Sequence, residues 1–343
     1  MSHKYITCTG FGGTGSSVIS DLMKEFSNVK SCGSDFEMSL AFDIGGISDL
    51  QHYLVDDFER HKITEGIYIF KRYIRIIQKG YCQFLGNDFI EIMDDYLRKI
   101  VLMEWNGENH MQHFRYGAFW RWFYYCLLPR TQNKIRKFLL MSDGYEHTAY
   151  LKKKLPMQLT VEESVFFEET RKMFSTILNL LDKNNQYEYL CFDQLVPPYN
   201  FDRYLKYFTN LKVVVIDRDP RDLYLLNKVY WKEAWIPSEN VNNYIKWFLG
   251  LRRTLQEDLV ANSKNVLFVK FEDTIYKYND TIDKIIHFLE IDPNNHIEKQ
   301  KYFNPERSMR NTKLWDRFPQ YQKDISEIEK ELNIFCYKYG FNL

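Results

Sequence analysis

A glycine-rich segment near the start of the sequence has the residue types and spacing of an anion-binding loop. It reads Gly10-Phe11-Gly12-Gly13-Thr14-Gly15-Ser16-Ser17, which is G-x-x-x-x-G followed by two small residues, with serine where such loops usually carry lysine. Glycines let the backbone wrap around an anion so that successive N–H groups point at it, and the serine hydroxyls can also donate. We therefore expect an anion on Gly12, Gly13, Thr14, Gly15, Ser16 and Ser17. A plain glycine turn between a strand and a helix is the alternative.

A second cluster with ligand chemistry is Arg218-Asp219-Pro220-Arg221-Asp222, which directly follows the apolar stretch 211–217 (LKVVVID). Guanidinium groups donate hydrogen bonds in pairs that match phosphate oxygens. Ligands of open α/β sheets bind at the carboxyl ends of the strands. The cluster therefore predicts a second phosphate contact, with a surface group of Arg–Asp ion pairs as the alternative.

The elements that would position these residues alternate between strands and helices. Strands are predicted at 4–9, 188–192, 211–217 and 265–270, and helices from Ser16 onward, near 279–289 and at 322–339. This rhythm favours an α/β fold in three layers, with a parallel sheet between helices and a P-loop-like first strand, loop and helix.

The middle of the sequence departs from this rhythm. Residues 45–180 are mostly helical in pattern and rich in aromatic side chains, and are most densely aromatic at 119–125 (FWRWFYY). We interpret the chain as one α/β domain, 1–343, with 45–180 as a helical insertion. The dense stretch predicts a buried helix, and a substrate-facing aromatic wall is the alternative.

Composition limits the class of protein. The 343 residues include 46 basic and 46 acidic side chains, and this zero net charge argues against a chain that coats nucleic acid or an anionic membrane, although it leaves room for a local basic site. No apolar run approaches the roughly 18 residues of a membrane span. The six scattered cysteines read as reduced thiols. We expect a cytoplasmic globular protein, with its oligomeric state open.

Taken together, four segments resemble the sulfotransferase family in the correct order. The 5′-phosphosulfate loop of that family has the form G-x-P-[KR]-[ST]-G-[ST]-[ST], and residues 10–17 look like it position for position. Residues 215–222 are similar to V-x-R-[DN]-P-[KR]-D with one extra residue. The strand–E-D–helix–FL element resembles 269–273 followed by 285–289, and 308–315 looks like the late loop that closes over the nucleotide. Residues 45–180 match no part of the family, so we expect them to be a cap that recognises the acceptor.

The resemblance implies transfer of a sulfuryl group from 3′-phosphoadenylyl sulfate (PAPS) to a hydroxyl, without a metal ion. Gly12 to Ser17 would hold the 5′-phosphosulfate and Arg218 the 3′-phosphate. Asp193, which follows the strand 188–192, is the candidate general base, and Ser16 is the second catalytic candidate. The acceptor would be a glycan or a small metabolite, for example a sugar bound for a polysaccharide.

Two departures from the family pattern bear on charge. Gly13 stands where the family has lysine or arginine, and the serine that helps to hold the 3′-phosphate falls near Leu226 or Asn227. Positive charge must then come from other residues. The candidates are Arg218, Arg221, Arg307, Arg310 and Lys313, with Asn311 beside the last three on a segment that could act as a lid.

Acceptor contacts are assigned to Glu37, Asp43 and Trp120, and for the two carboxylates a solvated loop with Ser34 and Asp35 is the alternative. His110 and His113 are alternative bases, or part of a metal site. Two other functions stay open from sequence. One is a kinase that uses Mg-ATP, with Ser16 or Ser17 and Asp193 or Asp217 as metal ligands. The other is a non-catalytic protein that binds nucleotide or glycan.

Overall fold

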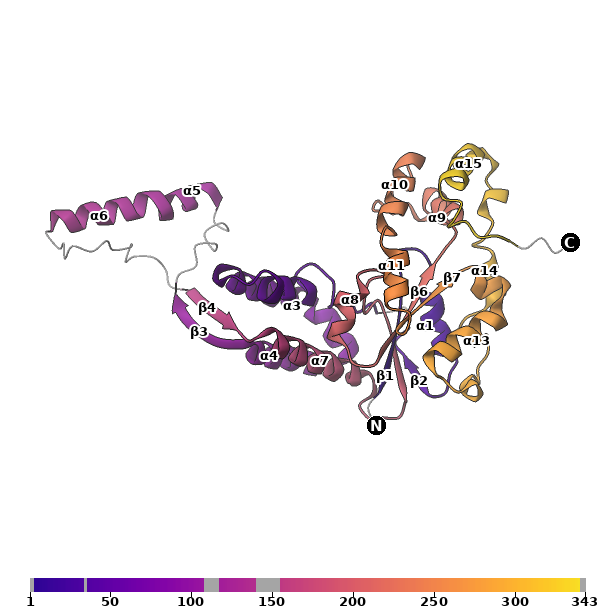
Figure 1. Ribbon diagram of the computed structural model, residues 1–343, viewed down its shortest axis with the longest axis horizontal. Helices are drawn as coiled ribbons and strands as arrows, with labels where there is room; N and C mark the ends of the chain where they lie inside the picture. The colour runs from indigo at the N-terminus through magenta and orange to yellow at the C-terminus, as the bar shows by residue number, and fades with distance from the viewer. Residues whose placement is uncertain (1–2, 34–35, 108–116, 140–154, 340–343) are drawn as a thin grey trace. The chain divides into compact units, whose positions relative to one another are not determined.

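The computed structural model describes residues 3–33, 36–107, 117–139 and 155–339 (Figure 1). The chain divides into two compact units, one formed by Met1–Ala41 and Phe174–Leu343 and the other by Phe42–Met173. We call them the sheet unit and the helical unit. Their boundary lies near that of the predicted insertion, 45–180. A role for the helical unit as an acceptor cap stays a prediction.

A parallel sheet forms the centre of the sheet unit, as the sequence pattern predicted, and it has five strands. In spatial order the strands are β2 (Val29–Ser31), β5 (Tyr189–Asp193), β1 (Lys4–Gly10), β6 (Leu211–Asp217) and β7 (Val266–Lys270). Strands β5, β1 and β6 are buried almost throughout, which explains their near-continuous apolar sequences. The short edge strand β2 was not predicted.

Helices cover both faces of this sheet. On one face, α1 (Ser17–Met23) and α13 (Tyr278–Leu289) share an apolar core with alternate residues of the strands, among them Ile6 and Val214 (Figure 1). On the other face, the Tyr5 hydroxyl donates to Asn179 Oδ1 at 2.8 Å. Helix α8 (Phe201–Tyr204) also lies on that side in Figure 1.

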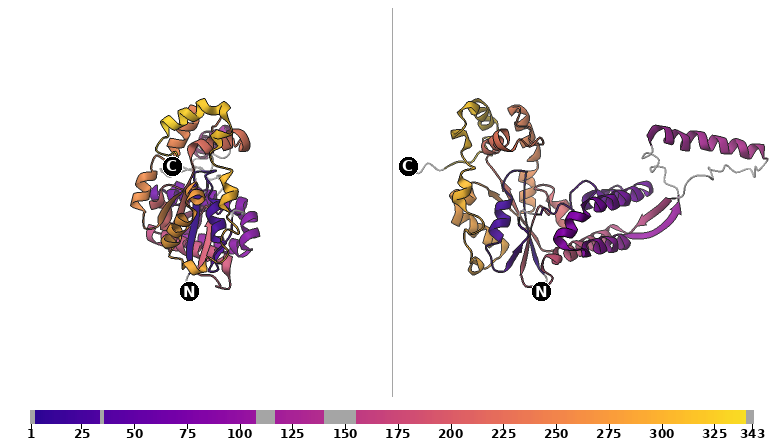
Figure 2. Two further views of the ribbon diagram at one scale, coloured as in Figure 1. Left: turned by 90° about the vertical axis from the view of Figure 1, so that its right-hand side faces the viewer. Right: turned by 180° about the vertical axis from the view of Figure 1, so that it is seen from behind.

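A further helical layer extends from the carboxyl ends of the strands (Figure 2). Its elements share a second apolar core. They are α9 (Pro220–Leu225), α10 (Val241–Leu251) and α15 (Gln322–Glu331). The same part of the chain also contains the short helices α11 (Leu255–Ala261), α12 (Asp273–Tyr276) and α14 (Pro305–Met309). The expected helix 322–339 was too long. The chain leaves the helix after Glu331 because its apolar stripe ends at buried Leu332, whereas Ile334 is 85% exposed.

The helical unit is not wholly helical. Its helices are α2 (Ile47–Gln51), α3 (Arg60–Leu85), α4 (Asp88–Ile100), α5 (Gly117–Trp122), α6 (Leu128–Phe138) and α7 (Glu163–Asn179), the last of which runs into the sheet unit. It also contains an unpredicted antiparallel pair, β3 (Val101–Gly107) and β4 (Leu155–Thr160). Its core includes the Tyr96 hydroxyl, 2.9 Å from the Thr170 hydroxyl.

The prediction that the aromatic stretch 119–125 is a buried helix was wrong about burial. The helix forms, but Phe119, Trp120 and Trp122 are 64%, 47% and 50% exposed. Burial requires a facing apolar surface as well as an apolar sequence, and the described residues provide no such surface for α5.

Candidate functional site

A cleft of about 590 Å³ opens at the carboxyl ends of four parallel strands of the sheet unit. The glycine loop follows β1, Asp193 ends β5, Arg218 follows β6, and Phe271 follows β7. Ligands of open α/β sheets bind at this edge. The cleft is lined by Gly13, Gly15, Ser16, Ser17, Val18, Asp21, Glu37, Asp193, Arg218, Trp231, Phe271, Tyr302, Phe303, Asn304, Arg307, Ser308, Arg310 and Asn311.

The glycine loop offers its backbone amides to the cleft. Three of its residues have positive φ, namely Gly12 (86°), Gly13 (67°) and Gly15 (99°), a conformation that side chains disfavour. The amides of 13–17 donate no hydrogen bond to any other described residue, and Ser16 does not cap α1. They are therefore available to an anion. The Thr14 hydroxyl donates to the Ile216 carbonyl at 2.9 Å, which fixes the loop to β6.

Arg218 is the buried cation of this cleft, 3% exposed. Its guanidinium lies 3.7 Å from the centre of the Phe271 ring, and one Nη donates to the Gly13 carbonyl at 3.2 Å. Its Nε has no hydrogen-bond partner among the described residues. Since an unpaired buried donor is costly, this nitrogen is suited to an anionic ligand.

Asp193 is the buried carboxylate of the cleft, 2% exposed. Burial raises its pKa to about 6, and the nearby Glu37 charge also raises it. Hydrogen bonds from the Cys8 thiol, at 3.3 Å, and from the Ser16 hydroxyl act in the opposite direction. A carboxylate with a pKa near neutrality can accept a proton efficiently at physiological pH.

The far wall of the cleft is the C-terminal segment that carries Arg307, Arg310 and Asn311. Both arginines are exposed. Buried Glu25 holds the start of this segment. It accepts hydrogen bonds from the amides of Gln300, Tyr302 and Phe303 and from His296 Nε2, all within 3.1 Å.

Buried Asp222 holds the other end of that segment by accepting from the amides of Lys313 and Leu314, at 3.1 and 2.8 Å. Lys313 itself does not line the cleft, and its ammonium lies over the rings of Tyr276 and Tyr339.

Other candidates lie outside the cleft. Arg221 is engaged within the protein, because it donates to Asp219, to Glu329 and to the Tyr337 carbonyl. Asn227 is also engaged, since its side-chain amide bonds to Ser238 and to backbone carbonyls. Gly12 and Thr14 shape the loop without lining the cleft.

Asp43 and Trp120 belong to the helical unit, where the Tyr73 hydroxyl donates to Asp43 at 2.9 Å. Their roles toward the acceptor stay predictions. Ser34, Asp35, His110 and His113 lie outside the described residues.

Sequence reasoning missed several lining residues. Asn304 lies four residues before the late loop, so extending that motif would have included it, and Ser308 is the first residue of that loop but received no role. Nothing in the sequence marked Trp231 as a residue of the site. It reaches the cleft only because a π-helical turn, Leu226–Trp231, directs the chain over the glycine loop, where a Cβ on Gly13 would lie 2.7 Å from the indole.

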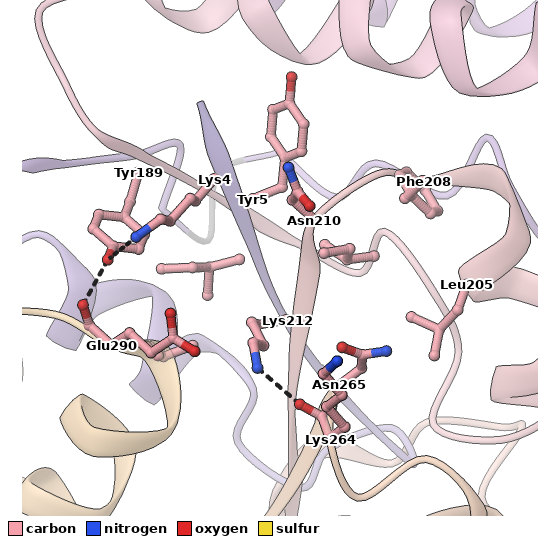
Figure 3. Close-up of a pocket in the computed structure, with 13 residues that line it drawn as sticks. Lys4, Tyr5, Tyr189, Leu205, Phe208, Asn210, Lys212, Lys264, Asn265 and Glu290 are labelled. Carbon is pink, nitrogen blue, oxygen red and sulfur yellow. Dashed lines mark hydrogen bonds between the residues drawn. The ribbon is translucent and has the colours of Figure 1, made fainter. Parts of the chain in front are cut away.

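A second cavity of about 520 Å³ lies at the opposite, amino ends of the same strands. Figure 3 shows that its polar groups bond to one another. Lys4 donates to the Tyr189 hydroxyl, which donates to the Glu290 carbonyl, and Lys212 donates to the Lys264 carbonyl. None of the predicted site residues lines this cavity.

No protein-family model and no curated protein matches the chain. Solved structures of several sulfotransferases are similar to it. The sulfotransferase domain from the curacin biosynthetic pathway is 11% identical, with 99% of each chain covered and a TM-score of 0.41. The sulfotransferase domain of the Synechococcus PCC 7002 olefin synthase is 12% identical, with 98% of this chain and 89% of that chain covered and a TM-score of 0.38.

A third similar structure is a retinol dehydratase in complex with androsterone and the inactive cofactor PAP. It is 14% identical, with 98% of this chain and 82% of that chain covered and a TM-score of 0.34. The chain is similar in structure to sulfotransferases, the family whose motifs its sequence resembles.

Proposed function

We propose that the protein is a PAPS-dependent sulfotransferase acting on a hydroxyl of a small molecule or a glycan. The observation that carries the proposal is the meeting of three features in one cleft: the amides of the glycine loop, the buried cation Arg218 and the carboxylate Asp193. Anion binding and a base in one cleft suit group transfer from an anionic donor to a hydroxyl.

The cleft fits a donor with two anionic groups. The backbone amides of residues 13–17 form one set of hydrogen-bond donors. The second set consists of the Arg218 Nε, which has no partner among the described residues, and the exposed side chains of Arg307 and Arg310. These cations replace the loop lysine or arginine that Gly13 lacks. Gly13 leaves no room for a long side chain there, because a Cβ would already meet Trp231. PAPS, when bound, supplies the sulfuryl group and the phosphate leaving group.

Each residue then has one task in the displacement. The Asp193 carboxylate accepts the proton of the acceptor hydroxyl as the oxygen–sulfur bond forms and the bond from sulfur to the leaving phosphate oxygen breaks. Loop amides and the Ser16 hydroxyl hold the oxygens on which charge accumulates. Glu37 is exposed at the cleft and pairs through its backbone with Asp193, and we assign it to the acceptor.

The first experiment compares thermal stabilisation by 3′,5′-bisphosphoadenosine (PAP) and by ATP, each with and without Mg²⁺. A ligand that binds only the folded state stabilises it by about 2.7 kcal/mol at a hundredfold excess over its Kd. We expect metal-independent stabilisation by PAP. Stabilisation by Mg-ATP alone would overturn the proposal in favour of a kinase. A lack of response to both ligands would indicate a protein that does not bind this donor.

Arg218→Ala tests the assigned cation. We expect PAP to bind roughly 10- to 100-fold more weakly, since hydrogen bonds to charged groups contribute about 1.5–3 kcal/mol, and adenosine 5′-phosphate to be little affected. Arg253→Ala removes an exposed arginine of the same unit and is the matched control. Because Arg218 is buried, exposed Arg307→Ala provides a second variant that leaves the core intact. Equal losses for both nucleotides would remove Arg218 from its role.

A further inference from the structure

Helices α5 and α6, joined by the π-helical turn Phe123–Leu127, form one element of the helical unit that none of the assigned chemistry uses. None of its described side chains is buried. Large apolar side chains are among the most exposed of the described residues, including Phe138 at 85% and Phe119 at 64%. This element, 117–138, is here called the aromatic helix.

Apolar side chains along the aromatic helix fall into a row. Leu127, Ile135 and Phe138 follow one another at intervals of eight and three residues, which is the spacing of one stripe along α6. Trp120 adds a further exposed ring on α5. All four are at least 40% exposed. A stripe of this kind normally faces an apolar surface.

Charge along the same segment has a single sign. Residues 117–139 contain Arg121, Arg130, Lys134, Arg136 and Lys137 and no aspartate or glutamate. The complete chain has equal numbers of acidic and basic residues, so the rest of it carries an excess of five acidic residues. The positive charge is thus concentrated where the apolar row is exposed.

An anionic lipid surface satisfies both features at once. Helices with tryptophan, phenylalanine and leucine on one face and lysine and arginine on the other lie in the membrane interface, where acyl chains cover the apolar face and anionic headgroups meet the cations. A nucleic acid or an anionic glycan would meet the charge but leave the apolar row in water. A second copy of the same helix would bring two sets of five positive charges together.

We propose that the aromatic helix binds the surface of membranes that contain anionic lipids, lying in the plane of the interface. No described helix is long and apolar enough to cross a membrane, and the attachment proposed here is peripheral. Under this proposal Trp120 contacts lipid instead of the acceptor. The inference is independent of the proposed donor and reaction.

The test is sedimentation of the full-length chain with vesicles of phosphatidylcholine alone and with vesicles that contain 30% phosphatidylglycerol. We expect binding to the anionic vesicles, and weaker binding at 1 M salt because the Debye length falls from about 10 Å at 0.1 M to about 3 Å. Equal binding to both kinds of vesicle, or no binding to either, would overturn the proposal.

Two variants test the two features separately. Trp120→Ser with Phe138→Ser removes apolar area, and Lys134→Glu with Lys137→Glu reverses charge. Each should weaken vesicle binding at least tenfold. Three exposed residues of the sheet unit give two control variants, Val260→Ser with Ile297→Ser and Lys330→Glu. All variants should keep the thermal unfolding transition of the wild type, measured without ligand, which shows that they fold.

Retained vesicle binding in either aromatic-helix variant would contradict the proposal. Concentration-dependent self-association that the Trp120→Ser, Phe138→Ser variant abolishes, without any vesicle binding, would instead identify a second copy as the partner.

Discussion

Asp193 is the residue whose surroundings say most about its chemistry. It ends a buried strand, so its carboxylate is desolvated and its pKa is raised to about 6, while the Cys8 thiol donates to it and partly restores the charged form. Cys8 carries no motif, and its register opposite Asp193 on the neighbouring strand follows from strand pairing alone. Asp193 itself could be proposed from sequence because it lies at a strand end, in the part of the chain that resembles sulfotransferases. Its thiol partner could not.

We predict that turnover depends on the protonation of Asp193. The deprotonated form is the base, so kcat/KM should rise as pH increases through about 6 and then level off. Cys8→Ala removes a donor that favours the charged form, so the rise should move to higher pH, whereas Cys8→Ser retains a donor and should move it less. The pH profiles of the three proteins with one acceptor are the measurement. Asp193→Asn should bind PAP but lose turnover. A profile unchanged in Cys8→Ala would contradict the assignment.

At the scale of elements, prediction succeeded where local sequence decides. The bounds of β6 agree with the prediction because a continuous run of β-branched residues favours a buried strand. The aromatic helix and the end of α15 were misjudged because burial and helix length depend on neighbours that the local pattern does not contain. The late segment was identified by resemblance, but its anchor Glu25 had no sequence signal.

Glu25 should therefore control the C-terminal wall of the cleft. Its side chain accepts three backbone amides and His296, so Glu25→Ala leaves several buried donors without a partner, each at a cost of about 1–3 kcal/mol. We expect a large loss in the free energy of unfolding, measured by chemical denaturation. Glu25→Gln retains one carbonyl oxygen and should lose less, while binding PAP more weakly than the wild type. A Glu25→Ala protein as stable as the wild type would refute this role.

The glycine loop gives a prediction with an internal control. Gly13→Ala forces a side chain into positive φ and against Trp231, so we expect a loss of stability of about 1–2 kcal/mol or more and weaker PAP binding. Gly250 lies within α10, and no atom lies within 4 Å of an added Cβ. Gly250→Ala should therefore stabilise the protein by roughly 1 kcal/mol. If both substitutions changed the free energy of unfolding in the same direction, strain at Gly13 would not explain the effect of Gly13→Ala.

At the scale of the whole molecule, folding buries three carboxyl groups at or near the cleft, and burying them in the charged form costs free energy. Burial raises the pKa of Asp193 to about 6, of Asp222 to about 7 and of Glu272 to about 8. Glu272 accepts from the Asp219 amide, and Asp222 holds the late segment, so two of the three carboxyls support elements of the cleft. The sequence showed only that these acids are present, because their burial arises from the assembly of three separate segments.

These three groups predict how stability depends on pH. Between the unfolded pKa values, near 4, and the folded values, the folded protein binds more protons than the unfolded chain, so the free energy of unfolding decreases as pH rises. The melting temperature of the ligand-free protein should be higher at pH 5 than at pH 8, with the decline ending above about pH 8. Glu272→Gln stays neutral at every pH and should flatten the upper part of the decline. A melting temperature that rises from pH 5 to 8 would show that these carboxyls are charged in the folded state, and an equal slope in Glu272→Gln would show the same for Glu272 alone.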